Sequence, residues 1–265
     1  MDVLSGAQVP ASPPAERLTW LGHATVLLEV GGARLLTDPL LRPRLGHLWR
    51  HAPTPAPDAI EPIDAVLISH MHIDHLDAAS LRRLRRGVTV LAPLGAGSLL
   101  RRLGFAGTTE MRVGERATVA GAEVIAVPAV HDGRRHPLAP AAEAIGFIVT
   151  GARRVYFAGD TDFFAGMAHL APTLDAALLP VWGWGPSLGP GHMDPPAAAR
   201  AAAVLRPRVA VPIHWGTFFP AGLARLRGTA LVEPPRAFAR LARDMAPGVE
   251  VRVLRPGETL GLEAE

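Results

Sequence analysis

The sequence contains no cysteine at any of its 265 positions. Disulfide bonds are therefore excluded, and so is every metal site that depends on thiolate ligands. Any metal ion that this chain holds must be bound by imidazole nitrogen and carboxylate oxygen. The 11 histidines and 24 acidic residues supply both kinds of ligand. The absence of cysteine therefore limits the possible ligand atoms to nitrogen and oxygen but does not exclude a metal site.

Lysine is also missing, so all 27 basic residues are arginine. The very high pKa of arginine inflates the sequence pI to about 10.7, whereas the formal net charge is only +3. The arginine-rich runs 81–86 and 100–103 alternate with leucine at helical spacing and contain no aromatic residue. This pattern is typical of a solvated helix face, and we expect no nucleic-acid partner.

No uninterrupted apolar run is long enough to cross a bilayer, so we expect no transmembrane segment. The first residues lack the basic and apolar regions of a secretory signal, and the sequence therefore predicts a cytoplasmic protein. Hydrophobic residues make up 49% of the chain and charged residues 19%, which indicates a globular protein with a substantial core. The sequence leaves the oligomeric state open.

The chain divides into a short leader and one domain. Residues 1–16 are rich in Pro, Ala and Ser, and we expect a flexible leader there, followed by a single domain over 17–265. Helices are predicted at 77–84, 196–205 and 235–242, and the stretch 41–62 predicts a long loop. Strands are predicted at 18–20, 25–30, 33–36, 65–68, 88–91, 117–119, 123–127, 145–149, 154–158, 176–179, 209–213, 249–253 and 259–262. Many strands with few helices favour sheet layers flanked by helices.

The stretch Ser69-His70-Met71-His72-Ile73-Asp74-His75-Leu76-Asp77 places three histidines and two aspartates directly after a buried strand. His70 and His72 are two residues apart and can point the same way, while the turn displaces Asp74 and His75. Two pairs of ligands on one turn suit two metal ions better than one. Imidazole and carboxylate without sulfur fit zinc, with manganese or iron as alternatives.

Three further strands also end in a possible metal ligand. The apolar runs 124–130, 155–159 and 209–213 are followed by His131, Asp160 and His214, respectively. Any one of these residues alone could be a chance polar residue on a surface turn. The whole set makes coincidence a poor explanation and predicts a metal site at the ends of several strands.

The order of these residues along the chain is His70-x-His72-x-Asp74-His75, then His131, Asp160 and His214. In this order the sequence resembles the metallo-β-lactamase superfamily. The resemblance covers residue 18 to about 216. It implies an α/β (α+β) fold, a four-layer αββα sandwich, with two zinc ions at one sheet edge. By the family pattern, His70, His72 and His131 would hold the first ion. Asp74, His75 and His214 would hold the second, with Asp160 bridging the two.

Within the superfamily, the chain looks most like a branch with N-acyl-phosphatidylethanolamine phospholipase D and ascorbate-6-phosphate lactonase. The stretches that carry this resemblance are 20–25, 37–39, 159–161 and 191–195. The best-known β-lactamases have a cysteine where Asp160 stands, so antibiotic hydrolysis is not implied. The phospholipase has an aromatic residue after the third histidine, whereas this chain has Asp132, which argues against a lipid substrate.

Three residues beyond the metal ligands are candidates for the reaction or for substrate binding. His192 lies in a stretch rich in Gly and Pro, and it could protonate a leaving group or orient the substrate. A hydrogen-bonded structural histidine is the alternative. Trp184 is predicted to wall the substrate pocket, although a core tryptophan would look the same. His23 is predicted to lie beside the site, contacting the substrate or supporting a ligand.

The sequence thus predicts a hydrolase with two metal ions that acts through a metal-bridging hydroxide. A phosphodiester or a phosphorylated lactone is the first candidate substrate, and a carboxylic ester or another lactone is the second. Two alternatives from other classes remain: a diiron redox module and a metal-binding protein without catalysis. Intact ligands favour the hydrolase over the last of these.

Overall fold

Two seven-stranded sheets face each other in the structure, a computed structural model that describes residues 15–136, 142–183, 189–224 and 228–263. The first sheet has the order β17-β1-β2-β3-β6-β7-β8. Its strands are β1 (Arg17–Gly22), β2 (Thr25–Val30), β3 (Ala33–Thr37), β6 (Ala65–Leu67), β7 (Thr89–Pro93), β8 (Thr108–Met111) and β17 (Thr259–Gly261). β3, β6, β7 and β8 pair in parallel, so their carboxyl ends meet at one edge.

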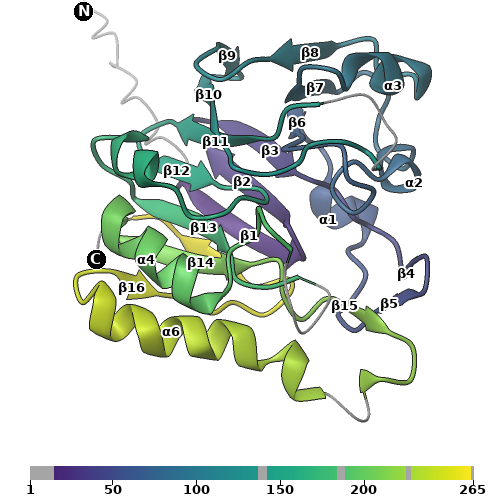
Figure 1. Cartoon of the computed structure of the whole chain (residues 1–265). Coiled ribbons are helices and arrows are strands. Elements are labelled where there is room, and N and C mark those ends of the chain that lie inside the picture. The colour runs from purple at the N-terminus through teal and green to yellow at the C-terminus, as the bar shows by residue number, and fades with distance from the viewer. Residues whose placement is uncertain (1–14, 137–141, 184–188, 225–227, 264–265) are drawn as a thin grey trace, which may run out of the picture.

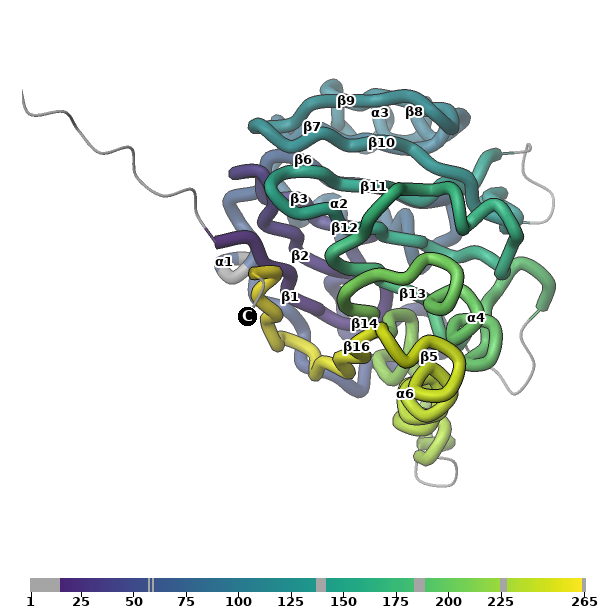
Figure 2. Tube along the Cα trace, turned by 90° about the vertical axis from the view of Figure 1, so that its left-hand side faces the viewer, coloured from purple at the N-terminus to yellow at the C-terminus, as the bar shows by residue number. Residues whose placement is uncertain are grey.

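The second sheet has the order β16-β14-β13-β12-β11-β10-β9. Its strands are β9 (Arg116–Val119), β10 (Ala122–Pro128), β11 (Ile145–Thr150), β12 (Arg154–Phe157), β13 (Ala176–Pro180), β14 (Val209–Ile213) and β16 (Glu250–Val251). β12, β13 and β14 are parallel, and every residue of β13 and β14 is buried. Parallel strands covered on both faces need such continuous apolar runs, which explains their composition. Figure 2 shows the two sheets running side by side as separate layers.

Helices cover the outer face of each sheet, and the main core lies between the sheets. Side chains such as Trp20, Val26, Phe147 and Phe157 fill that core. α4 (Pro195–Leu205) and α6 (Glu233–Met245) cover the second sheet, as Figure 1 shows, with the 3-10 helix η1 (Ala165–His169). α2 (Ala78–Leu81) and α3 (Gly97–Arg102) lie on the first sheet, and α1 (Pro57–Ile60) contributes one residue to the same cluster. The predicted αββα sandwich is confirmed.

The predicted helix starts agree with capping chemistry. The Asp194 side chain accepts a hydrogen bond from the Ala197 amide at the start of α4, and two prolines occupy the first helical positions. Asp77 caps α2 in the same way, although α2 ends at Leu81 and only isolated turns continue to residue 84.

The stretch 41–62 is more structured than the long loop that its sequence predicts. It contains β4 (Arg44–Leu45) and β5 (Leu48–Arg50), which form a small third sheet with β15 (Phe218–Pro220), and it ends in α1. Arg50 holds this sheet against the sandwich by donating hydrogen bonds to the carbonyls of Leu21 and Leu40. The loop prediction was wrong here because the partner strand lies far away in the sequence.

Residues 1–14 of the predicted leader lie outside the described residues, but its last residue, Glu16, is described. This residue belongs to the predicted leader, yet its side chain is buried and accepts hydrogen bonds from the amides of Gly31, Ala152 and Arg153. It therefore joins a turn of the first sheet to a turn of the second, and the fold includes it.

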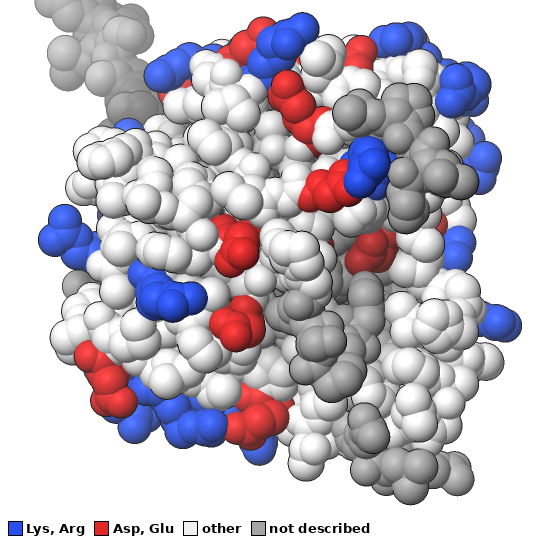
Figure 3. Space-filling view, in the orientation of Figure 1, with Lys and Arg blue, Asp and Glu red and all other residues white. Residues whose placement is uncertain are grey.

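Among the described residues, no helix has the length and apolar character needed to cross a bilayer. On the face in Figure 3, most arginine side chains lie toward the rim, several of them next to acidic side chains, and wide areas between them are uncharged. The described residues of this face form no continuous basic patch of the kind that binds nucleic acid. The cytoplasmic location stays a prediction.

Candidate metal centre

The seven predicted ligands converge at one edge of the sandwich, and each lies in the segment that follows a strand. His70, His72, Asp74 and His75 lie on the turn after β6. His131, Asp160 and His214 follow β10, β12 and β14 of the opposite sheet. The cluster therefore forms where the loops of the two sheets meet, and folding brings its members together.

Three imidazoles form a first group, here called the first trio: His70, His72 and His131. The distance from His72 Nδ1 to His70 Nε2 is 2.9 Å, and the distance from His72 Nδ1 to His131 Nε2 is 3.1 Å. With metal–ligand bonds of about 2.1 Å and tetrahedral angles, the ligand atoms of one zinc ion lie about 3.4 Å apart. The three nitrogens are thus spaced as the ligands of one ion.

A second group, the second trio, consists of Asp74, His75 and His214. His75 Nε2 lies 3.3 Å from His214 Nε2, and Asp74 Oδ2 lies 3.6 Å and 3.7 Å from these two nitrogens. The same tetrahedral spacing of about 3.4 Å applies. The second trio therefore fits one further ion and, unlike the first, contributes a negative charge.

Asp160 lies between the two trios. Its Oδ2 is 3.2 Å from His75 Nε2, 3.4 Å from His214 Nε2 and 3.9 Å from His70 Nε2. Its Oδ1 is buried and has no hydrogen-bond partner among the described residues. A buried carboxylate oxygen without a partner is costly unless it binds a cation, so the residues present fit a metal group.

The outer nitrogens of four imidazoles are hydrogen bonded, which fixes the ring orientations. A donor at Nδ1 leaves the lone pair of Nε2 facing the centre, the arrangement that metal-binding histidines usually have. The Nδ1 contacts are His70 to Ser69 Oγ (2.9 Å), His75 to Asp38 Oδ2 (2.7 Å), His131 to the Gly191 carbonyl (2.8 Å) and His214 to the Trp182 carbonyl (2.7 Å).

Asp38 is a site residue that sequence reasoning missed. Its carboxylate is fully buried and accepts hydrogen bonds from the Ser69 amide, the Ser69 hydroxyl and His75 Nδ1. One carboxylate thus supports His75 directly and His70 through Ser69. Gly159 makes this approach possible, since a Cβ there would lie 2.5 Å from the Ser69 Cβ. The only signal in the sequence was the Thr37-Asp38-Pro39 motif at the end of a strand.

Burial and charge set the protonation of the cluster. Burial lowers the pKa of His70 and His72, and it lowers the pKa of His131 to about 4, so the first trio is neutral near pH 7. Burial alone would raise the pKa of Asp74 and Asp160, but the surrounding imidazoles hold both pKa values well below the usual range. The neighbouring carboxylates raise the pKa of His75 and His214, so an ion at these imidazoles must displace protons, whereas the first trio already has the neutral form that binds metal ions.

The other predicted site residues differ in their placement. His192 points at the centre, with Nε2 3.7 Å from Asp160 Oδ2 and its ring centroid 4.7 Å from that of His131. His23 lies beside Asp74, with 3.1 Å between His23 Nε2 and Asp74 Oδ2, and is 1% exposed. Trp184 lies outside the described residues.

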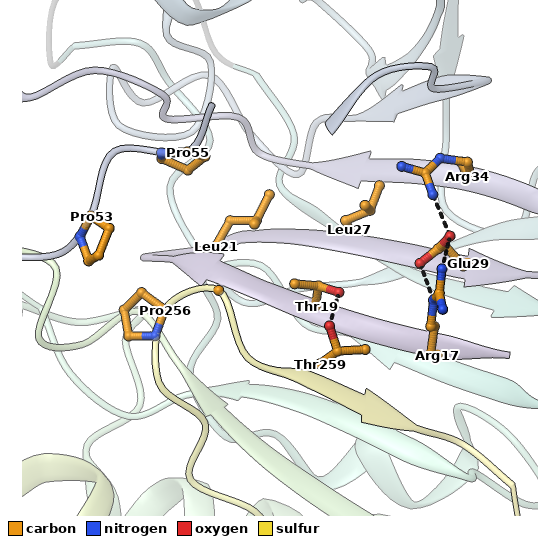
Figure 4. Close-up of a pocket in the computed structure, with 11 residues that line it drawn as sticks. Arg17, Thr19, Leu21, Leu27, Glu29, Arg34, Pro53, Pro55, Pro256 and Thr259 are labelled. Atoms are coloured by element: carbon orange, nitrogen blue, oxygen red, sulfur yellow. Dashed lines mark hydrogen bonds and ion pairs between the residues drawn. The ribbon is translucent and has the colours of Figure 1, made fainter. Parts of the chain in front are cut away.

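A hollow of about 410 Å³ lies elsewhere, on the outer face of the first sheet, and no predicted ligand lines it. Figure 4 shows Arg17 and Arg34 both directed at Glu29, and Thr19 paired with Thr259. The polar side chains of this hollow satisfy one another, whereas the centre holds a carboxylate oxygen without a partner. The histidine cluster is therefore the candidate functional site.

Comparisons with known proteins show which family this chain resembles in sequence and in fold. The family model described as "Beta-lactamase superfamily domain" matches residues 33–215. A UPF0173 metal-dependent hydrolase from Methanopyrus kandleri is 32% identical, over 92% of this chain and 98% of its own length. The solved structure of a metallo hydrolase from Ignicoccus hospitalis has a TM-score of 0.73 and 27% identity, covering 95% of this chain and 100% of its own.

A further solved structure shows how widely the fold is used. A diiron β-hydroxylase from Streptomyces venezuelae has a TM-score of 0.70 and 23% identity, covering 94% of this chain and 55% of its own. At that identity the likeness concerns the fold alone. The fold therefore does not decide which metal the centre holds or which reaction it supports.

Proposed function

The chain belongs to the beta-lactamase superfamily and is a metal-dependent hydrolase, and on that premise we propose that it works with two metal ions. Zinc is the metal that the donor set favours, with manganese or iron as alternatives. The first candidate substrate is a phosphodiester or a phosphorylated lactone, and the second is a carboxylic ester or another lactone. The predicted superfamily is confirmed, whereas the branch within it stays a prediction.

One observation carries the proposal of two ions. The ligand atoms separate into two trios with metal-like spacing, and a single carboxylate, Asp160, lies within 3.9 Å of both. One tetrahedral ion takes four ligands, so seven converging ligands exceed its needs. A carboxylate has two oxygens and can contact two ions, which makes Asp160 the natural bridge.

The protein's own side chains have separate tasks in this proposal. Bound ions would activate a water molecule and polarise the carbonyl or phosphoryl oxygen of the substrate. His192 lies at the rim, with its side chain 27% exposed, where a leaving group would depart. Its Nδ1 donates to the Gly189 carbonyl at 3.2 Å, so Nε2 faces the centre, and a proton that Nε2 first takes up to form the imidazolium would pass from there to the leaving group.

Metal analysis and a substrate panel test the proposal together. Protein loaded with zinc and then dialysed should retain about two ions per chain, because seven ligands serve two tetrahedral sites. The panel contains bis(p-nitrophenyl) phosphate, a phosphorylated lactone and p-nitrophenyl acetate, and metal-free protein is the control. Retention of no more than one ion after loading would contradict the two-ion proposal.

The panel also separates the alternatives. Turnover of the acetate without turnover of either phosphate compound would favour an ester hydrolase. A diiron redox module would retain iron in preference to zinc and would hydrolyse none of the three compounds. A metal-binding protein without catalysis would retain two ions and remain inactive throughout.

A further inference from the structure

His23 lies at the turn between β1 and β2 and has a backbone conformation that few side chains adopt. Its φ angle is +54°, in the left-handed region. A histidine held there costs about 1 kcal/mol or more, and such strain persists only where surrounding contacts impose it. The strain suggests that the position serves the site.

Three hydrogen bonds impose this conformation. The His23 amide donates to Thr217 Oγ1 (2.6 Å), and the His23 carbonyl accepts from Trp20 Nε1 (2.9 Å) and from the His214 amide (3.0 Å). The His214 amide belongs to a ligand of the second trio, which itself has a positive φ of +61°. The first hairpin is thereby tied directly to the loop that carries His214.

The imidazole of His23 is enclosed beside the second trio. Its ring centroid lies 4.1 Å from that of His214 and 6.1 Å from that of Phe218. The side chain is 1% exposed, which leaves a substrate almost no surface to contact. The sequence predicts a substrate contact at His23, whereas this enclosure favours an action through a neighbouring ligand.

That neighbour is Asp74. His23 Nε2 lies 3.1 Å from Asp74 Oδ2, the same oxygen that lies 3.6 Å and 3.7 Å from the ligand nitrogens of His75 and His214. An ionised carboxylate only accepts hydrogen bonds, so the proton of this contact must be on His23 Nε2. A nitrogen that donates its proton has no lone pair left for a metal, although its distance alone would suit a ligand.

We propose that His23 is a positioning residue: its Nε2–H holds the metal-facing oxygen of Asp74 in place and thereby sets the affinity of the second trio for its ion. This inference rests on the proposed two-ion centre. The hydrogen bond orients the carboxylate before the ion arrives, so its loss should weaken one ion and leave the first trio unaffected. Loss of such a supporting contact usually costs about 10- to 100-fold in metal affinity.

Two variants that differ only in where they place an amide donor test this proposal. In His23→Gln the side-chain nitrogen reaches the region of Nε2, whereas in His23→Asn it reaches only the region of Nδ1. Zinc affinity for each of the two ions is measured by competition with a chromophoric chelator. His169→Asn is the matched control, because His169 is exposed on η1 and lies apart from the centre.

We expect His23→Asn to bind one of its two ions about 10- to 100-fold more weakly, with the other unchanged. His23→Gln should regain most of that affinity, and His169→Asn should match the parent protein. Thermal unfolding of each metal-free variant verifies that it is folded.

Equal behaviour of the Gln and Asn variants would overturn the proposal. If both lose the ion, and the cobalt-substituted protein shows a changed ligand-field spectrum in both, His23 is itself a ligand. If both keep the ion, the contact has no bearing on affinity. The parent protein is titrated first, so binding of a single ion there would count against the two-ion centre itself and not against the role of His23.

Discussion

The two trios differ in spacing and in surroundings: the printed distances between ligand atoms are 2.9 and 3.1 Å in the first trio and 3.3 to 3.7 Å in the second. His72 and His131 of the first trio are only partly buried, whereas Asp74, His75 and His214 are between 0% and 8% exposed. The first trio consists of neutral imidazoles, and the second includes a carboxylate and has Asp160 at 3.2 Å and 3.4 Å. Because opposite charges attract strongly where water is excluded, the second trio should hold its ion more tightly.

The supports of the two trios differ as well. A backbone carbonyl of Gly191 orients His131, while Ser69 Oγ orients His70. In the second trio, Asp38 contacts His75, His23 contacts Asp74 and the backbone carbonyl of Trp182 orients His214, so two buried ionisable side chains support it. In the proposed two-ion centre, the ion of the second trio would therefore lie in the buried interior, and the ion of the first trio would lie nearer to the surface.

Asp160→Ala should have the largest effect, because Asp160 is the one ligand that both trios share in the proposed centre. We expect both ions to be lost on dialysis, and kcat/KM to fall by more than about 10⁴-fold, beyond the contribution of one general acid. Metal analysis with steady-state kinetics measures both. Asp162→Ala is the control, since the Asp162 side chain accepts a hydrogen bond from the neighbouring Phe163 amide. Loss of the second ion alone would show that Asp160 serves the second trio only.

His192 lies next to His131 of the first trio, so His192→Ala should lower the rate of the reaction without removing either ion. If His192 protonates the leaving group, kcat should fall by about 10²- to 10⁴-fold. The loss should shrink for substrates that release p-nitrophenolate, which departs without a proton. An equal loss for all leaving groups would instead favour substrate positioning, and loss of an ion would make His192 a ligand.

Asp38→Asn should have the smallest effect of the three. It should weaken metal binding at one trio more than at the other. The amide cannot accept from His75 Nδ1 and both Ser69 donors as the carboxylate does. We expect the affinity for one ion to fall by about 10- to 100-fold, with a smaller change in the other. Asp64→Asn is the control, because Asp64 is exposed and its side chain contacts the Arg34 amide. Equal weakening of both ions would mean that the trios share one support.

That the seven predicted ligands lie together could be predicted from the sequence, because each comes shortly after an apolar run. The pattern is local: a buried run, then a histidine or an aspartate, as at His131 and His214. In a parallel sheet, the carboxyl ends of the strands meet at one edge, however far apart the strands are in the sequence. The predicted fold class therefore implied that the residues after these strands lie close together.

Residues that act through long-range contacts could not be predicted in this way. Asp38 supports Ser69 and His75, which lie 31 and 37 residues further on, and its own neighbourhood reads only as the end of a hairpin. β8 was missed because its sequence, Thr-Thr-Glu-Met, has no apolar run. The third sheet was missed because β5 pairs with β15, about 170 residues away, and two- or three-residue strands carry no period.

The separation of the ligands along the chain has a consequence for the stability of the protein. His75 and His214 are 139 residues apart, yet their ligand nitrogens lie 3.3 Å from each other. Bringing these two histidines together in the unfolded chain would cost loop-closure entropy, so an ion binds the folded state almost exclusively. By mass action, a free metal concentration of 100 times the dissociation constant adds about 2.7 kcal/mol to the free energy of unfolding. The melting temperature of this protein should therefore rise with the concentration of free metal. A bound ion would connect segments that are distant in the sequence, as a crosslink does.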